Sequence, residues 1–177
     1  MSKEVKKVSV VRECGDCTMC CEGFLPANIH GYEMKPGMPC HFVQQGTCNG
    51  CTIYEDRPSL CRSYECLWKS SPAAIPEWMK PNKSDVILTV RAVVDDDGEQ
   101  HEYIQMREGH NTVRGDVLNW VLRLGFGGEG YVNLEYEVGR HWYFYGGKKW
   151  IEYMMGPTGP HRQIQETLNN SKHPLPQ

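Results

Sequence analysis

The segment Cys14-Gly15-Asp16-Cys17-Thr18-Met19-Cys20-Cys21 places four cysteines within eight residues. Five more cysteines follow within the next 45 residues: Cys40, Cys48, Cys51, Cys61 and Cys66. No cysteine follows Cys66. Free cysteines otherwise behave as small buried apolar residues, and such residues would be scattered singly along the chain. The clustering therefore indicates that these thiols bind a metal ion or an iron–sulfur cluster.

The spacing C-x2-C-x2-C from Cys14 to Cys20 supplies three ligands from a single loop. It matches the first three ligands of a bacterial-type iron–sulfur loop, whose fourth ligand comes from elsewhere in the chain. Zinc sites more often take two ligands from each of two separate C-x2-C knuckles, and Cys48-Asn49-Gly50-Cys51 has that spacing. The sequence therefore favours a [4Fe–4S] cluster and leaves zinc as the alternative.

The number of thiols exceeds the need of one four-coordinate centre. Two centres, or one centre with spare structural thiols, both fit the nine cysteines. His30 and His41 each offer a nitrogen that could replace a thiolate. Four thiolates around a divalent ion leave a net charge of about -2, which either Arg57 or Arg62, the two arginines flanking Cys61, could offset.

The expected cellular compartment follows from the number of cysteines and from the lack of a targeting signal in the sequence. Residues 1–11 are charged and lack the apolar run of a signal peptide. No stretch is apolar for long enough to cross a bilayer, and an odd number of cysteines cannot pair fully within one chain. We therefore expect a cytoplasmic protein with reduced thiols, in which a metal staples a glycine- and proline-rich segment that has little core of its own.

Charge gives no reason to expect a nucleic-acid partner. The formal net charge is -3 and the sequence pI is near 6.2, whereas nucleic-acid binding calls for a basic surface. We expect no membrane partner either, and a protein partner remains open.

The end of the cysteine-rich segment predicts one helix. Pro58 suits a first helical turn, so the pattern predicts a helix over residues 59–68. Because five residues turn a helix by about 500°, either this helix ends before Cys66 or Cys61 and Cys66 serve different corners of the site. Residues 69–83 contain three prolines and predict an extended connector.

Beyond residue 84 the sequence becomes richer in β-branched and aromatic residues. It predicts a small antiparallel sheet and one main helix, with a solvated turn at the acidic residues 95–98. The predicted elements are a strand over 86–94, a strand over 103–106, a helix over 113–124 that stops at Gly125, a strand over 132–138 and a closing hairpin over 142–155.

The expected fold class is α+β, with an irregular cysteine-rich metal-binding module packed with the small sheet and its main helix. The expected organisation is a cysteine-cluster module over residues 1–68, a proline-rich connector over 69–83, an α+β region over 84–155 and a polar tail over 156–177.

The cysteine-rich segment resembles the YkgJ-type cysteine-cluster family, described as zinc- or iron-chelating proteins. The resemblance covers residues 14–66, about a third of the chain. It rests on the pattern CxxCxxCC, then C, then C-x-I-Y-x-x-R-P-x-x-C-R-x-[FY]-x-C, which this chain carries as Cys51-Thr-Ile-Tyr-Glu-Asp-Arg-Pro-Ser-Leu-Cys61-Arg-Ser-Tyr-Glu-Cys66 at its end. The resemblance implies eight metal ligands and leaves Cys48 as the extra cysteine: Cys14, Cys17, Cys20, Cys21, Cys40, Cys51, Cys61 and Cys66.

The resemblance also implies one enzymatic setting, since a related module occurs in flagellin lysine methylases. This chain departs from the family at Glu65, where a proline is frequent, and no methyl-donor site is visible in its sequence. Three functions thus remain open at this point. They are a redox or cluster-handling protein, a structural zinc module that presents a protein-interaction surface, and a part of a protein-modifying enzyme.

Overall fold

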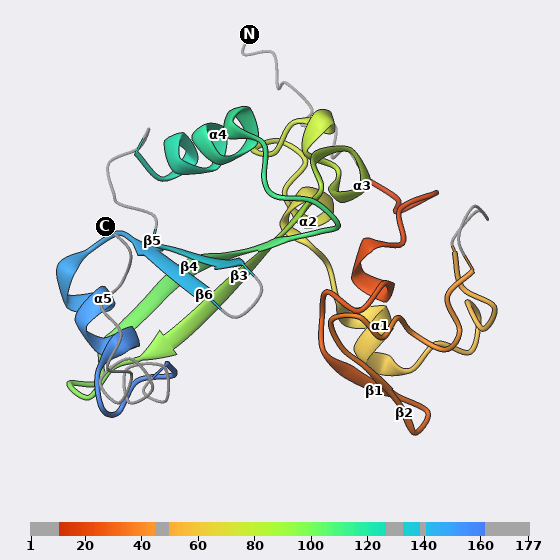
Figure 1. Cartoon of the computed structure of the whole chain (residues 1–177), viewed down its shortest axis with the longest axis horizontal. Helices are drawn as coiled ribbons and strands as arrows, with labels where there is room; N and C mark the ends of the chain where they lie inside the picture. Colours follow the sequence, from red (N-terminus) through yellow and green to blue (C-terminus); the bar gives the residue numbers. More distant parts are fainter. Residues whose placement is uncertain (1–10, 45–49, 127–132, 139–140, 162–177) are drawn as a thin grey trace, which may run out of the picture. The chain divides into compact units, whose positions relative to one another are not determined.

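The computed structural model describes residues 11–44, 50–126, 133–138 and 141–161 (Figure 1). These residues contain both helices and strands, so the α+β class is confirmed at that level. In chain order the elements are η1 (Met19–Cys21), β1 (Ala27–Ile29), β2 (Tyr32–Met34), α1 (Ser59–Ser63), α2 (Leu67–Ser70), η2 (Glu77–Met79), α3 (Pro81–Ser84), β3 (Val86–Val94), β4 (Gln100–Glu108), α4 (Gly115–Phe126), β5 (Asn133–Val138), β6 (His141–Tyr145) and α5 (Lys148–Met155).

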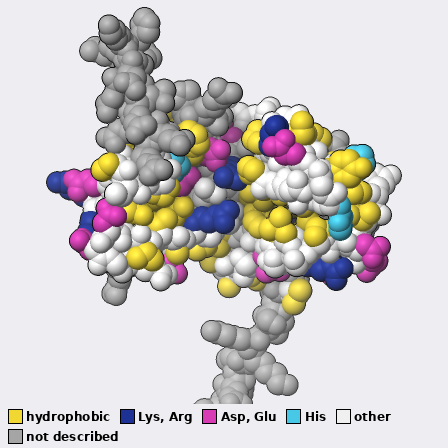
Figure 2. Space-filling view, turned by 90° about the horizontal axis from the view of Figure 1, so that it is seen from below, with side chains coloured by type: hydrophobic (Ala, Val, Ile, Leu, Met, Phe, Trp, Pro, Cys, Tyr) yellow, Lys and Arg dark blue, Asp and Glu magenta, His cyan; other side chains and the backbone are white. Residues whose placement is uncertain are grey.

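The described residues form two compact units. The first contains the residues up to Thr89 together with Arg107–Val117, and the second contains Val90–Met106 and the residues from Leu118 onward. One sheet has the order β1-β2 and the other has the order β3-β4-β5-β6. On the face drawn in Figure 2, side chains of both charge signs lie among hydrophobic ones.

The cysteine-rich segment contains a short hairpin that its sequence pattern did not predict. Strands β1 and β2 pair antiparallel, with Ile29 opposite Tyr32. The two residues between them, His30 and Gly31, have φ values of 50° and 88°. Positive φ at both central positions is the requirement of a type I′ turn, whose twist matches that of paired strands. The backbone at this turn therefore closes the hairpin, and Ile29 and Met34 turn inward, with 2% and 7% of their surface exposed.

The predicted helix over residues 59–68 is wrong as a single element. Helix α1 ends at Ser63. Tyr64, which follows it, has an extended backbone, and Cys66 is an extended residue that precedes the first turn of α2. Cys61 and Cys66 therefore lie on different elements, and the helix ends before Cys66. Leu67 and Trp68 are buried, so the second turn forms where an apolar pair can pack.

The extended connector predicted over residues 69–83 is also wrong. This stretch forms the end of α2, the 3₁₀ turn η2 and the short helix α3. Pro76 precedes η2 and Pro81 begins α3, because proline is tolerated where a helix has no amide to bond. Ile75 and Met79 are almost fully buried, so the segment is part of the packed first unit.

The central strands and the main helix follow the predicted pattern. Strand β3 covers the predicted 86–94, and β4 extends the predicted 103–106 to Gln100–Glu108. Helix α4 continues through Gly125 to Phe126 rather than stopping at it. Val117 and Val121 lie one helical turn apart and are buried, which is the period-3.6 signal of an amphipathic helix.

The closing hairpin predicted over residues 142–155 is wrong in its second half. Strand β6 forms within the predicted first half, but its partner is β5, and residues 148–155 form helix α5. Trp150 and Met154 lie four residues apart on that helix and pack with Tyr103 in a buried cluster. Side chains spaced by four share one face of a helix and would also share one face of a strand, so periodicity alone could not separate the two readings.

The last described residues form turns that fold back onto the end of α5. The amide of Gly159 donates to the carbonyl of Gly156 at 3.1 Å, and the amide of His161 donates to the carbonyl of Met154 at 3.1 Å. The polar tail predicted over 156–177 otherwise lies outside the described residues. Among the helices that are described, none is both long and apolar enough to cross a membrane.

The turn at residues 95–98 is not the fully solvated turn that the sequence predicted. Asp95 is only 9% exposed, and its carboxylate accepts hydrogen bonds from the amides of Asp97 and Glu99 at 3.0 and 2.8 Å. His101 Nε2 lies 2.8 Å from Asp95 Oδ2. This bond lowers the pKa of Asp95 from 3.8 to about 2, helped by the Glu99 amide and by the charge of Lys149, while burial opposes the shift.

Replacing Asp95 with Asn is expected to destabilise the second unit at neutral pH and to have less effect in acid. The carboxylate has a lower pKa in the folded chain than in the unfolded one, so its stabilising effect is complete above pH 3.8 and is lost as the pH falls toward 2. The difference is measured by urea denaturation at about pH 6 and about pH 2.5, with the exposure of the α5 amides as the signal of unfolding. Asp96→Asn, which leaves the His101 bond in place, is the matched control, and an Asp95→Asn deficit of equal size at both pH values would contradict the expectation.

Candidate metal centre

The first four cysteines lie on a loop and a 3₁₀ turn. The amide of Cys17 donates to the carbonyl of Cys14 at 3.0 Å, and the amide of Cys21 donates to the carbonyl of Thr18 at 2.7 Å. Met19, inside the turn η1, is 2% exposed and anchors it. These bonds set the direction of each thiol, and the sulfurs of Cys20 and Cys21 come to lie 3.9 Å apart.

Asp16 holds this loop against a distant part of the first unit. Its carboxylate accepts from Lys80 Nζ at 2.6 Å and from Asn82 Nδ2 at 3.1 Å. The Lys80 side chain is only 11% exposed but that of Asp16 is 73% exposed, so solvent still screens this ion pair. The same two bonds also hold Asp16 ionised, because they lower its pKa.

A second anchor joins the loop to the beginning of α2. Arg12 donates to the carbonyl of Trp68 at 2.7 Å, and its guanidinium lies 4.8 Å from the centre of the Trp68 ring. Cys66 stands two residues before Trp68, at the start of the same helical turn. The anchors on Arg12 and Asp16 therefore bring the first cysteines to the part of the chain that carries Cys66.

A different set of backbone bonds gathers the middle cysteines. The amide of Cys40 donates to the carbonyl of Cys21 at 2.8 Å. Val43 forms an isolated antiparallel bridge with Cys51, and the amide of Thr52 donates to the carbonyl of Phe42 at 3.0 Å. The segments that carry Cys40 and Cys51 therefore run side by side, next to Cys21.

One glycine makes this arrangement sterically possible. Gly50 has φ +54°, and a Cβ at this position would overlap the Cγ2 methyl of Thr18. A side chain at this position would therefore push Gly50, and with it the neighbouring Cys51, away from Thr18. The glycine permits both the positive φ and the close approach.

Two arginines surround Cys61 and differ in their roles. Arg62 donates to the carbonyls of Arg57 and Glu55 at 2.6 and 2.7 Å, which fixes the turn before α1. Arg57 lies over the ring of Tyr54, 3.4 Å from its centre. The hydrogen bond with Cys20 lowers the pKa of Cys21, and the charge of Arg57 adds to that shift. Burial and neighbouring thiolates raise the pKa of Cys61, and the charge of Arg57 opposes that rise.

Cys17, Cys20 and Cys66 all have raised pKa values, and a thiolate at Cys14 is one of the contributing charges. Burial raises the pKa of Cys17 and of Cys66, and a thiolate at Cys14 raises both further. The hydrogen bond with Cys21 raises the pKa of Cys20 well above its usual range, and burial and the charges at Cys21, Cys14 and Cys17 add to the effect. Backbone amides oppose the shifts: those of Met19 and Asn82 donate to Cys17, and those of Lys69 and Trp68 donate to Cys66.

Cys40 and Cys61 have raised pKa values, to which charges at Cys21 and Cys51 contribute. Burial raises the pKa of Cys40, and thiolates at Cys21 and Cys51 raise it further. Burial also raises the pKa of Cys61, and here the thiolates at Cys21, Cys40 and Cys51 all contribute. The hydrogen bond from Cys20 lowers the pKa of Cys21.

The eight cysteines implied by the resemblance thus lie near one another, but not in one tight shell. Among the described residues, no three cysteine sulfurs lie within 4.8 Å of each other. His41 stacks on Tyr32 with ring centres 3.9 Å apart, and His30 lies edge-on to Phe42 at 5.9 Å. Both histidines are therefore engaged in ring contacts, while Cys48 lies outside the described residues.

The donor set fits a thiophilic metal. Thiolates are the soft ligands that select zinc and iron–sulfur clusters, and a positive metal favours the thiolate form that burial and mutual repulsion disfavour. Amides that donate to sulfur, as at Cys17, Cys40 and Cys66, are among the features that tune iron–sulfur potentials. The residues present could therefore hold either zinc or a cluster, and metal binding would release protons.

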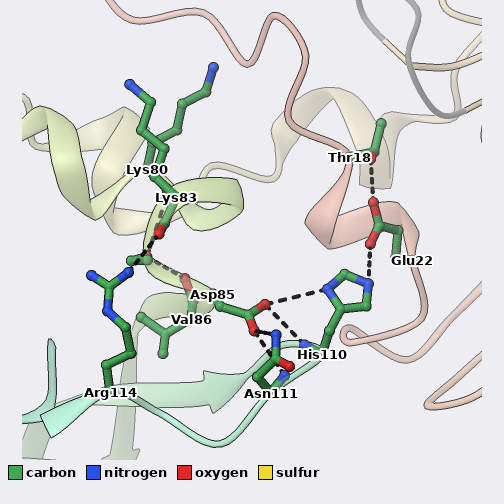
Figure 3. A network of polar contacts seen from close by, with 10 residues as sticks. Thr18, Glu22, Lys80, Lys83, Asp85, Val86, His110, Asn111 and Arg114 are labelled. Carbon is green, nitrogen blue, oxygen red and sulfur yellow. Dashed lines mark hydrogen bonds and ion pairs between the residues drawn. The ribbon is translucent and has the colours of Figure 1, made fainter.

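A polar network lies directly after Cys21 and was not predicted from the sequence (Figure 3). Glu22 bonds to the hydroxyl of Thr18, and its other oxygen lies 2.8 Å from His110 Nε2. Asp85 accepts from the amides of His110 and Asn111 at 3.0 and 2.8 Å. The network ties the end of the cysteine turn to the loop after β4, and no local spacing signals it because its members are far apart in the chain.

A second group that the sequence missed lies in the second unit. Asp95, Glu99 and His101 offer three metal-ligand atoms within 4.8 Å of one another. Lys149 Nζ lies 2.6 Å from Glu99 and 3.6 Å from Asp95. A lysine ammonium therefore already pairs with both carboxylates of this group, and the arrangement serves the turn between β3 and β4.

Comparison of the chain with protein-family models, with curated proteins and with solved structures gives no match. The assignment of a function therefore depends on the residues of the chain and on their arrangement.

Proposed function

We propose that the clustered cysteines bind an iron–sulfur cluster, with [4Fe–4S] favoured over zinc, and that the protein acts in electron transfer or in cluster handling. The observation that carries the proposal is the approach of cysteines from four separate segments to one another within the first unit. A purely apolar role would not require this convergence, because isolated buried cysteines would pack equally well.

Two features favour a cluster over a single ion. The C-x2-C-x2-C run with a remote fourth cysteine is the ligand pattern of bacterial [4Fe–4S] loops. Zinc bonds to sulfur at about 2.3 Å, so four thiolates on one tetrahedral zinc stand only about 3.8 Å apart. A cubane cluster carries each thiolate on a different iron and tolerates a wider spacing. Among the described residues no three cysteine sulfurs lie within 4.8 Å of one another, a spacing that suits the larger group better.

A structural zinc module is the second candidate. The Cys48–Cys51 knuckle supports it, because a knuckle with a glycine is a usual source of two zinc ligands. In that case the role is the support of an interaction surface for a protein partner. In both cases we propose a cytoplasmic setting, because reduced thiols are required.

Metal analysis of protein purified without oxygen tests the proposal. We expect iron and acid-labile sulfide, a brown colour and a visible absorption band that bleaches on reduction. Zinc without colour would favour the structural module instead. Protein that stays free of iron and zinc, both as isolated and after anaerobic reconstitution with either metal, would contradict both readings.

A further inference from the structure

We infer that the eight cysteines build two separate four-thiolate centres rather than one centre with spare thiols. The first centre is formed by Cys14, Cys17, Cys20 and Cys66, and the second by Cys21, Cys40, Cys51 and Cys61. This inference rests on the proposed function, since it assigns ligands to the centres proposed above.

The contacts of the first set tie together the two chain segments that contribute to it. The Cys14–Cys17 turn is closed by its own backbone bond at 3.0 Å, and Asp16 in that turn is held by Lys80 and Asn82. Arg12 reaches the carbonyl of Trp68, two residues from Cys66. Three ligands from one loop and a fourth from a distant segment, here the start of a helix, are the ligand pattern of a [4Fe–4S] site.

The contacts of the second set are different and do not involve these anchors. The bond from Cys40 to the carbonyl of Cys21 and the bridge between Val43 and Cys51 align three of its members. Cys61, which lies on helix α1 of the same unit, is the remaining cysteine of the eight and completes this set. The second set therefore takes one cysteine from each of four segments.

The two centres meet at the peptide bond between Cys20 and Cys21. Consecutive side chains in a 3₁₀ turn leave the backbone about 120° apart, so neighbouring residues can serve neighbouring groups. Their sulfurs lie 3.9 Å apart, which places the two metal groups close enough for rapid electron exchange. In each [4Fe–4S] group every iron would carry a protein thiolate, so no iron would remain open to a substrate. This closed coordination favours electron transfer over catalysis at the metal.

Double Cys→Ser variants separate the two-centre inference from the one-centre alternative. The same-set variants are Cys17→Ser/Cys66→Ser and Cys40→Ser/Cys61→Ser, and the cross-set variant is Cys17→Ser/Cys61→Ser. Cys48→Ser is the control, because the inferred ligand sets exclude it. Iron and sulfide per chain are measured after anaerobic reconstitution, together with the electron paramagnetic resonance spectrum of the reduced protein.

We expect about eight irons per chain in the wild type and in Cys48→Ser, about four in either same-set variant, and almost none in the cross-set variant. The reduced wild type should show a spectrum broadened by coupling between two spins, and each same-set variant should show a simple spectrum of one cluster. The wild-type measurements do not depend on the folding of any variant.

Iron equivalent to a single cluster in the wild type, without spin coupling, would overturn the inference while leaving the proposed function intact. Equal iron contents in the same-set and cross-set variants would overturn the partition into these sets. If the wild type binds zinc instead, the same double variants apply without the Cys48→Ser control, with about two zinc ions expected in place of two clusters. Absence of any metal would refute the proposed function itself.

Discussion

Removal of the metal is expected to unfold the cysteine-rich part of the first unit and to leave the core of the second unit protected. Among the described residues from 11 to 66, only three hydrophobic side chains are buried: Met19, Ile29 and Met34. So few apolar contacts cannot offset the entropy lost when a long irregular segment is ordered. Structural metal sites supply such free energy directly, and zinc-finger peptides gain about 10–16 kcal/mol in apparent binding free energy at neutral pH.

Hydrogen exchange followed by mass spectrometry measures this effect on the full chain. Before and after chelation, the amides of β1, β2 and α1 should change from protected to freely exchanging. The amides of α5 should change little, because Trp150 and Met154 are packed with Tyr103 in a core that contains no cysteine. Anaerobic reconstitution of the same sample, which should restore protection, is the control. Protection that persists at β1 and α1 in metal-free protein would contradict a scaffold role for the metal.

Replacing Gly50 with Ala is expected to reduce metal content almost as strongly as the loss of a ligand. The new Cβ would overlap the methyl group of Thr18, so the loop that presents Cys51 could no longer lie against the turn that carries Cys21. The positive φ adds about 1–2 kcal/mol of backbone strain, and overpacking typically adds about 1–3 kcal/mol. Metal per chain and the midpoint of urea denaturation are the measurements.

Two further variants separate the clash from the strain. Gly37 also has a positive φ, +80°, but nothing lies within 4 Å of its Cβ position, so Gly37→Ala carries the strain alone and should retain its metal. Thr18→Ser removes the methyl group and keeps the hydroxyl that bonds Glu22. The double variant Gly50→Ala/Thr18→Ser should therefore recover much of the metal. Equal losses in Gly50→Ala and Gly37→Ala would show that close approach at Gly50 is unimportant.

Elements whose own residues carry a strong pattern were predictable from the sequence. The β-branched run of β3 and the turn after it define the strand pair β3 and β4 without reference to distant contacts. Helix α4 is likewise set by apolar residues such as Val117 and Val121 at helical spacing. These signals are local, and local geometry decides them.

Elements decided by distant contacts were missed. Helix α5 depends on the burial of Trp150 and Met154 against Tyr103, a residue of strand β4. The break between α1 and α2 depends on the packing of Leu67 and Trp68, which favours a new turn over the continuation of a helix. In each case the local sequence tolerates two conformations, and tertiary packing selects one.

The cysteine site divides in the same way. The sequence by itself determined the ligand chemistry, because spacing such as C-x2-C-x2-C reports which thiols a single loop can present. Only the tertiary structure decided which thiols are neighbours, since that depends on bonds between residues far apart, such as Asp16 with Lys80 and Cys21 with Cys40. Ligand type is a property of residues and short loops, whereas the membership of each set is a property of how those loops are anchored.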